Sequence, residues 1–485
     1  MRRRKTSNLP KIIITIIILA AIGILGWMWY TKTGIFHTPG NVGYADSLSP
    51  EQQATLDEIF AGNTELELDH DVVISLETNT KLNPDLPIYD IRVPVTDFYA
   101  STTGVTSAEV TANSENVISV LELTNQQKLL ELDGVYYLDS FVEGAFFLQL
   151  QVTGREQDVV KITTLLEENL LTFPNSDSVL TLAQTGVTAL TRGMTVKLNE
   201  VGDATYFAAN IGEFLSRFDL THTSNEASFT NLAAARNICA DPRMLNTLLA
   251  IGLDIVELTG NHNLDCGADT ALNTLEIYAA NGIQTFGGGA NATDGATPLE
   301  LSKKGTNITM LGYNLSTGGY TLGSMPGANF YTTEKARADI NAAKARGDFI
   351  IVDVQYYECN EYDNTVDSHY CDFADSAAGD QIGLFREIID LGADVVVGTS
   401  AHQPQTYELY GNGVIYYGLG NLFFDQIWWP GTTRSLVLIH YFYNGKLLQT
   451  RIVPTIYGDE MQTRLMDTTS AEAFLKRLVE AKPEA

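Results

Sequence analysis

Six short polar segments in the second half of the chain carry residue types that could do chemistry. Each comes after a run of apolar residues that predicts a β-strand. His, Asn and Glu side chains together can bind a transition metal, or can act as general acid, general base and donors to a developing negative charge. Arg192 is the one Arg or Lys in the set, which makes it the natural candidate for binding an anionic substrate. The segments are Thr191-Arg192-Gly193, Ser224-Asn225-Glu226, Gly260-Asn261-His262-Asn263 with Asp265, Gln355-Tyr356-Tyr357-Glu358, Gly398-Thr399-Ser400-Ala401-His402-Gln403 and Gly420-Asn421.

One such segment alone would be weak evidence for a site. Asn tolerates turn geometry and His can satisfy a local hydrogen bond, so an isolated Gly-Asn-His run is more simply a turn. Six segments in one region favour a site, because ligands in layered α/β folds collect at the carboxyl ends of strands. We therefore expect the six to meet in one cleft. His222, two residues before Ser224 in the same strand pattern, is a further and weaker candidate.

The elements that must position these residues alternate from about residue 185. Apolar, strand-like runs alternate with helical patterns, which predicts parallel strands joined by crossover helices. After residue 405 the pattern changes to hairpins, with a turn signal at Asn444-Gly445, and 470–481 predicts a terminal helix. The strand-like runs lie at 187–191, 254–261, 348–355 and 393–402, and the helical patterns at 206–218, 269–282 and 380–392.

Residues 51–183 form an earlier region with a different pattern. Apolar runs at 71–78, 88–95 and 145–154 predict strands, and 158–171 has helical spacing. The mixture predicts a small α/β or α+β domain. Its role stays open between ligand binding and a spacer.

The amino terminus predicts a membrane anchor. Residues 12–30 are 19 residues without a charge, close to the roughly 20 that cross a bilayer as a helix. Five basic residues in the tail 1–11 predict a cytoplasmic amino terminus and an extracytoplasmic remainder, with 31–50 as a linker. We thus expect a single-pass protein of the cell membrane. The alternative is a cleaved signal peptide.

Charge and cysteines limit the partners and the compartment. The chain has 30 Lys and Arg against 59 Asp and Glu, and a surface this acidic repels nucleic-acid backbones, so no nucleic-acid partner is expected. Four cysteines lie in the exported part, where cysteines often pair. Cys359 and Cys371 are the expected local pair, and four free thiols are the alternative.

Two long blocks resemble the CapA family of capsule-synthesis (PGA-cap) proteins. They are TGNHNLDCGADTALNTLEIYAANGIQTFGGGANATDGATP and IIDLGADVVVGTSAHQPQTYELYGNGVIYYGLGNLFFDQ. The resemblance implies a CapA-like domain over 185–460, followed by 461–485 with the terminal helix. It also implies an α/β fold: a four-layer, metallophosphoesterase-like sandwich, here preceded by the transmembrane helix and the small domain. The family residues kept are Glu226, Asn261, His262, Asp265, His402 and Asn421.

The chain also departs from the family pattern. Thr191-Arg192 stands where the family has Gly-Asp, Ser224-Asn225-Glu226 replaces Asn-Leu-Glu, Gln355-Tyr356-Tyr357 replaces His-Trp-Gly, and Thr399-Ser400-Ala401-His402 departs from His-x-Pro-His. An Arg cation beside two metal ions would repel both, which disfavours a dinuclear centre. One divalent ion, Mn²⁺ or Zn²⁺, remains open, with candidate ligands Glu226, Asn261, His402 and Glu358.

These observations support three functional hypotheses. The first is a membrane-anchored CapA-like protein in biosynthesis, retention or trimming of an anionic, poly-γ-glutamate-like surface polymer, with that polymer and other capsule-synthesis proteins as partners. Its catalytic candidates are His262 or His402 as acid or base, Glu226 and Arg192. The second is a non-catalytic binding protein on the same scaffold, and the third a metal-dependent phosphoesterase. The substrate-binding candidates are Arg192, Asn225, Asn261, Gln355 and Asn421.

Overall fold

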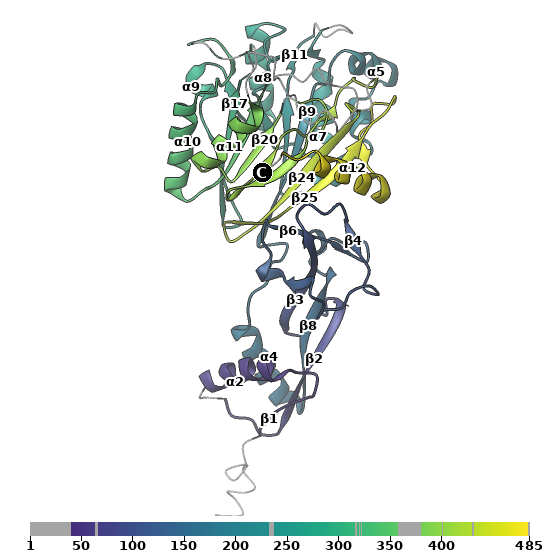
Figure 1. The fold of residues 1–485 in the computed structure, drawn as a ribbon, viewed down its shortest axis with the longest axis vertical. Helices are drawn as coiled ribbons and strands as arrows, with labels where there is room; N and C mark the ends of the chain where they lie inside the picture. The colour runs from purple at the N-terminus through teal and green to yellow at the C-terminus, as the bar shows by residue number, and fades with distance from the viewer. Residues whose placement is uncertain are drawn as a thin grey trace, which may run out of the picture. The chain divides into compact units, whose positions relative to one another are not determined.

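The computed structural model describes residues 40–63, 66–231, 237–315, 318–319, 321, 323–356, 380–399, 401–428 and 431–483 (Figure 1). The expected membrane segment at 12–30 lies outside these residues. Within them, no helix combines the length and the apolar character needed to cross a bilayer. The chain divides into two compact units, the first of residues 1–92 and 145–173, the second of 93–144 and 174–485.

The first unit packs two helices against a small sheet. Leu56 of one helix and Ile162 of the other are buried against Ile74 and Leu150 of the strands. Ser49 caps the first helix in a capping box with Gln52, which satisfies amides that the helix leaves without partners. The elements are β1 (Val42–Tyr44), α2 (Pro50–Gly62), β2 (Val72–Lys81), β3 (Ile88–Asp97), β8 (Glu143–Thr153) and α4 (Glu156–Asn169).

Residues 93–144 belong to the second unit, although the sequence predicted one domain over 51–183. Arg451 forms ion pairs with Glu131 and Asp139 of this segment. The segment therefore packs on the last strands of the chain. It contains β4 (Gly104–Val105), β5 (Val117–Ser119), η1 (Val120–Glu122), β6 (Gln127–Leu129), β7 (Glu131–Leu132) and α3 (Tyr137–Ser140).

The second unit is built on two large sheets. The first has the order β14-β13-β10-β9-β24-β25-β26, and β23 also pairs with β9. Its strands β14, β13, β10 and β9 are parallel, whereas β24 to β26 form antiparallel pairs. The strands are β9 (Val179–Thr188), β10 (Leu220–Asn225), β13 (Ile255–Glu257), β14 (Gln284–Phe286), β23 (Asn421–Phe423), β24 (Arg434–Tyr443), β25 (Lys446–Ile456) and β26 (Arg464–Leu465).

The second sheet has the order β16-β17-β19-β20-β22-β21. Its four central strands are parallel, and β16 and β21 close the edges antiparallel. The strands are β16 (Leu299–Lys303), β17 (Thr306–Asn314), β19 (Phe349–Gln355), β20 (Val395–Gly398), β21 (Tyr407–Tyr410) and β22 (Gly413–Tyr416).

Alternation along β19 shows how the layers pack. Ile351 belongs to a core shared by both sheets, whereas Ile350 and Val352 belong to a second core with the helices. Because successive side chains of a strand point to opposite faces, Asp353 and Gln355 lie on the same face as Ile351. Helices α10 (Thr333–Arg346) and α11 (Gln381–Leu391) run along the other face of this sheet, where Ile340 and Phe385 are buried (Figure 1).

The remaining elements connect these strands. The helices are α5 (Gly193–Val201), α6 (Gly212–Ser216), α7 (Leu245–Ala250), α8 (Ala268–Ala280), α9 (Ala292–Gly295), α10 (Thr333–Arg346), α11 (Gln381–Leu391) and α12 (Thr468–Glu480). The short turns and bridges are η2 (Ala204–Ala208), η3 (Pro242–Met244), β11 (Ser228–Phe229), β12 (Cys239–Ala240), β15 (Gly288–Gly289) and β18 (Gly327–Ala328).

The mixed α/β class and most predicted elements agree with this arrangement. The helix expected over 206–218 is an exception, because the segment forms η2 and then the short α6. Gly212 begins α6 against Ala250, and a Cβ built on it would lie 2.7 Å from the Ala250 carbonyl oxygen. The chain breaks there to pack closely on α7. The turn at Asn444-Gly445 formed as expected, and both residues have positive φ.

Candidate functional site

Three of the predicted residues meet at one buried amide. Gln355 ends β19 of the second sheet, while Glu226 and Asn261 follow β10 and β13 of the first. The Gln355 Nε2 donates to Asn261 Oδ1 at 3.1 Å and to Glu226 Oε1 at 3.4 Å. Gln355 and Glu226 are almost fully buried. The ends of β10, β13 and β19 therefore converge, whereas one cleft for all six segments stays a prediction.

Hydroxyl groups continue this cluster to a fourth strand. Thr399, directly after β20, donates to the Gln355 Oε1 at 3.4 Å. Its hydroxyl is also 3.4 Å from that of Thr259, whose carbonyl oxygen accepts from Asn314 at 2.5 Å. The two Gln355 contacts and the Thr399 contact together fix which end of the amide carries the oxygen. Gln355, Glu226, Asn261, Thr399 and Thr259 are called the amide cluster below.

Gly260 allows the loop after β13 to pass directly over Glu226. A Cβ built on Gly260 would lie 2.9 Å from Glu226 Cα and 3.0 Å from Glu226 Cγ. Real Cβ atoms do not approach backbone so closely, and only glycine fits a close approach of this kind. The glycine thus brings Asn261 next to Glu226.

His262 follows the amide cluster residue Asn261 and pairs with Asp265. The Nδ1 of His262 is 2.8 Å from Asp265 Oδ2, and the two side chains are 29% and 38% exposed. Glu226 and His402, by contrast, are 1% and 3% exposed. A carboxylate at Nδ1 fixes the orientation of the imidazole ring. His262 is therefore the predicted acid or base that a large substrate can reach.

A disulfide holds the loop that carries His262. Cys239 in β12 is bonded to Cys266, the residue after Asp265. β12 pairs with β11, which begins two residues after Glu226, and Ser228 of β11 donates to the Asn263 carbonyl at 2.6 Å. The loops after β10 and β13 are thereby tied together. Four free thiols are excluded, and the expected partners Cys359 and Cys371 lie outside the described residues.

His402 forms a second group with Asn421. The Nδ1 of His402 is 2.9 Å from Asn421 Oδ1, and its ring packs on Phe424 with centroids 5.3 Å apart. The Asn421 Nδ2 donates to Gln426 Oε1 and to the Thr432 carbonyl, each at 3.1 Å. Asn421 is therefore held by its neighbours and orients the His402 ring.

Arg192 belongs to the same group but its charge is already balanced. Its guanidinium donates to Asp425 Oδ1 and lies over the Phe424 ring, 4.5 Å from the centroid. The Gly193 amide donates to the other Asp425 oxygen at 2.9 Å. An anionic substrate at Arg192 would have to compete with Asp425, so its role as a substrate-binding residue stays a prediction.

The two groups share one edge of the first sheet. The Glu226 amide donates to the Thr188 carbonyl at the end of β9, and Asn421 is in register with Val187 on the other side of that strand. Asn225 turns inward from this edge, because its Nδ2 donates to the Ala227 carbonyl at 2.7 Å. The amide cluster and the His402 group thus flank β9, with Asn225 held by its own loop.

His222 does not belong to the site. It is fully buried between the sheets, with Nε2 3.1 Å from Asp353 Oδ2. Gln184 donates to the other Asp353 oxygen at 2.7 Å, and His440 is 3.1 Å from the Gln184 amide oxygen. Burial lowers the pKa of His440 to about 3. These residues form a polar network inside the core. Its member Asp353 lies on β19, two residues before Gln355.

The same interior raises the pKa of Glu257. This carboxyl group is fully buried at the end of β13 and accepts from the Thr259 amide. Burial, and then the charge of Asp353, raise its pKa to about 8. Glu257 therefore holds its proton more tightly than an exposed Glu does, and it connects to the amide cluster through Thr259.

The described residues of the amide cluster do not fit a metal ion. A metal needs oxygen or nitrogen lone pairs, whereas the Gln355 NH₂ group donates to the oxygens of both Glu226 and Asn261. Among residues that the structure describes, no three His, Cys, Asp or Glu side chains gather as metal ligands would. Glu358, a predicted ligand, lies outside the described residues.

Asp425 and Thr259 were missed by the sequence analysis. Asp425 lies four residues after Asn421, at the end of the apolar run LFF, which is the kind of strand exit used to find the others. Thr259 directly precedes Gly260 in a segment already singled out. Position alone could have suggested both, but their partners lie far away in the sequence.

Residues 181–426 match the family of bacterial capsule synthesis proteins PGA_cap. Capsule biosynthesis protein CapA of Bacillus anthracis is 26% identical over 215 residues, 43% of this chain and 49% of that protein. PGA biosynthesis protein CapA of Bacillus subtilis (strain 168) is 28% identical over 204 residues, 41% of this chain and 50% of that protein. The chain thus spans about half the length of these curated relatives.

Among solved structures, TT1561 of Thermus thermophilus is similar with 9% identity and a TM-score of 0.29, over 55% of this chain and 99% of that one. A likeness at that level adds nothing to the fold described above.

Proposed function

Because this chain belongs to the PGA_cap family of bacterial capsule synthesis proteins, we propose that it acts in the production of an anionic surface polymer. The observation that carries the proposal is the extent of the family match, 181–426, which begins in β9 and includes every predicted strand exit up to Asn421. The names of the two relatives, a capsule and a PGA biosynthesis protein, make a poly-γ-glutamate-like polymer the first candidate. The step is assembly, retention or trimming of that polymer.

The chemistry at the site supports an acid–base role for His262. Its side chain is more exposed than those of Glu226 and His402, and Asp265 orients its ring. If the chain cleaves or transfers the polymer, His262 gives or takes the proton, and the amide cluster, which includes the preceding residue Asn261, supplies fixed dipoles. Glu226, predicted as the carboxylate partner, is held by Gln355 instead.

We propose, more specifically, that the mixed α/β fold of the second unit is a four-layer, metallophosphoesterase-like sandwich. Two mixed sheets that share a core, with α10 and α11 over the outer face of the second, support this proposal. No metal-dependent step is included, because the Gln355 NH₂ group, which has no lone pair for a metal, faces the oxygens of Glu226 and Asn261.

We also propose that residues 12–30 anchor the protein in the cell membrane with the bulk outside the cytoplasm. The Cys239–Cys266 disulfide supports this placement, because disulfides persist in oxidising compartments. Membrane fractionation of cells that express the full chain, followed by protease treatment of intact protoplasts, tests it. A protected, soluble chain would contradict the anchor.

The proposed function is tested by complementation. Cells that lack this protein should make less polymer, measured as glutamate released by acid hydrolysis of the surface fraction, and the wild-type gene should restore it. His262→Ala should fail to restore it at equal protein level. His70→Ala is the matched control, because His70 also pairs with an Asp, Asp158, but lies in the first unit. Normal polymer in the deletion strain would contradict the proposal.

The second candidate is a non-catalytic polymer-binding protein. The amide cluster favours it, since Gln355 holds both Glu226 and Asn261 through hydrogen bonds donated by its own amide. Purified protein would then retain polyglutamate on a column without changing its chain length. A shortened or lengthened polymer, lost in His262→Ala, would reject this candidate in favour of catalysis.

A further inference from the structure

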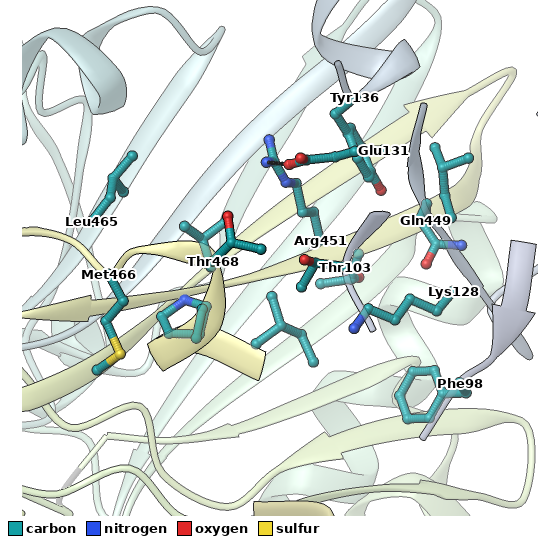
Figure 2. Close-up of a pocket in the computed structure, with 16 residues that line it drawn as sticks. Phe98, Thr103, Lys128, Glu131, Tyr136, Gln449, Arg451, Leu465, Met466 and Thr468 are labelled. Carbon is teal, nitrogen blue, oxygen red and sulfur yellow. Dashed lines mark hydrogen bonds and ion pairs between the residues drawn. The ribbon is translucent and has the colours of Figure 1, made fainter. Parts of the chain in front are cut away.

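A cavity of about 220 Å³ lies away from every predicted site residue. It lies in the second unit, between residues of 98–136 on one side and of β25, β26 and α12 on the other, and it is partly open to solvent (Figure 2). With roughly 30 Å³ per liquid water, it has room for about seven waters. That volume is too small for a polymer coil and suits a molecule of amino-acid size.

Lys128 is the chemically distinctive residue in the wall. Its side chain reaches inward from β6 (Figure 2), and its Nζ donates to the Ala100 carbonyl at 2.9 Å. Burial lowers its pKa to about 8. Among the described residues, no carboxylate comes within ion-pair distance of its ammonium group. A half-buried ammonium group without a carboxylate partner is costly, and an anion in the cavity would reduce that cost.

The other charges around the cavity are already paired. Arg451 binds Glu131 at 2.5 Å and Asp139 at 2.6 Å, and it lies over the Tyr136 ring. Glu472 accepts from the amide and the hydroxyl of Thr103 at 2.9 and 3.0 Å. Glu472 and Glu131 raise the pKa of Lys128 by charge alone, without a direct contact. Lys128 is therefore the group left for a ligand.

The rest of the wall is apolar where a ligand body would lie. Phe98, Leu465 and Met466 line the cavity, and Figure 2 shows the Met466 side chain on the side opposite Lys128. We propose that the cavity binds a small carboxylate, whose head pairs with the Lys128 ammonium and whose methylene chain packs against Phe98 and Met466. The proposal is independent of the proposed function, since none of its residues belongs to the predicted site.

The carboxylate could come from a free metabolite or from the end of a polymer. Glutarate and glutamate represent the first source, and a short γ-linked glutamyl oligomer the second. The full chain is titrated with each by calorimetry at pH 7. Glutarate is expected to bind, and 1,5-diaminopentane, of the same length and opposite charge, is expected not to bind. If the cavity admits the end of a polymer chain, the oligomer should bind as tightly as glutarate. If the ligand is a free small molecule, the oligomer should bind more weakly.

Two variants and one proton measurement separate the site from general charge effects. Lys128→Met should weaken glutarate binding roughly 10- to 100-fold, the loss of one charge-assisted hydrogen bond. Lys344→Met, at an exposed lysine of α10, should leave it unchanged. At pH 8, binding should take up a fraction of a proton, seen in buffers of different ionisation enthalpy, because the anion restores the Lys128 proton.

Leu465→Trp keeps Lys128 but fills part of the cavity, so it should also weaken binding even if Lys128→Met fails to fold. The proposal is overturned if glutarate does not bind the wild-type chain. It is equally overturned if the diamine binds as well as glutarate, or if folded Lys128→Met and Leu465→Trp both bind glutarate like the wild type.

Discussion

The Asp425 carboxylate accepts two hydrogen bonds from the Arg192 guanidinium, at 3.1 Å from Nε and 2.5 Å from Nη2, and a third from the Gly193 amide at 2.9 Å. The two residues lie 233 positions apart in the chain. Arg192 has a positive φ, which most side chains avoid, and the contact to Asp425 holds it and the start of α5 in place. Arg192 therefore has a structural role: it holds the segment that follows β23 through Asp425.

Asp425→Ala should destabilise the second unit by about 1.5–3 kcal/mol, the range for hydrogen bonds to charged groups. Urea unfolding at pH 7, followed by the Trp fluorescence of the full chain, measures the change. Asp459→Ala, at an exposed Asp nearby in the sequence, is the control and should have no effect. An Asp425→Ala midpoint equal to that of the wild type would contradict the structural role of the pair.

Gln355→Glu should create a divalent-ion site that the wild-type amide cluster lacks. The new carboxylate would face the Glu226 carboxylate, which costs stability without an ion and supplies two anionic ligands with one. In a thermal melt, Mn²⁺ should stabilise Gln355→Glu by about 2.7 kcal/mol at 100 times its dissociation constant.

Gln355→Met is the matched control for this change. It removes the donor to Glu226 without adding a ligand, so Mn²⁺ should shift its melting temperature no more than that of the wild type. If Mn²⁺ raises the melting temperature of the wild type as much as that of Gln355→Glu, the amide cluster already binds a metal and our account of Gln355 is wrong.

Much of the fold could be predicted, because apolar residues form clear strand-like runs or recur at helical spacing in five of its elements. These are β13, α8, β19, α11 and β20. Their parallel order also placed Glu226, Asn261 and Gln355 together before any contact was known. The rule works because the carboxyl ends of parallel strands meet at one edge.

The remaining features depend on pairing between distant segments, which no local pattern encodes. The Arg192–Asp425 ion pair and the Cys239–Cys266 disulfide are set by which loops the two sheets bring together. His222 looked like a site residue because it shares a strand with Ser224, but position along the strand placed it opposite Asp353 inside the core. The segment 206–218 has helical spacing, yet close packing at Gly212 divides it.

Gly260→Ala should lower both stability and polymer production. The added methyl group would overlap Glu226, and overpacking of this kind costs about 1–3 kcal/mol. Gly458→Ala is the control, because a Cβ there meets nothing within 4 Å. The unfolding midpoint and the complementation assay are measured for both. Equal values for the two variants would show that the approach of Gly260 to Glu226 is unimportant.

Removing the disulfide should loosen the loop that carries His262. The cysteines are 27 residues apart, and closing a loop of that length contributes about 3 kcal/mol to the stability of small proteins. Cys239→Ala with Cys266→Ala should therefore unfold at lower urea concentration. Hydrogen exchange at 260–267 should also become faster, while exchange in β9 should stay slow. Unchanged exchange in the loop would contradict its restraint by the disulfide.

The buried Glu257 predicts how stability depends on pH. Its pKa is raised from 4.5 to about 8, first by burial and second by the charge of Asp353. The folded state therefore holds a proton that the unfolded state releases above pH 4.5. The stabilisation is complete below that value and is lost as the pH rises through about 8, with a slope of at most about 1.4 kcal/mol per pH unit.

Glu257→Gln keeps the shape and cannot titrate, so it isolates this contribution. The difference in unfolding free energy between the variant and the wild type, measured in urea from pH 5 to pH 9, should grow in favour of the variant as the pH rises. Asp254 and Asp394 also have raised pKa values because of burial, but both proteins contain them, so their effects cancel in the difference. Parallel curves for the two proteins across this range would mean that Glu257 is ionised in the fold. Its hydrogen bond from the Thr259 amide would then be made by a carboxylate.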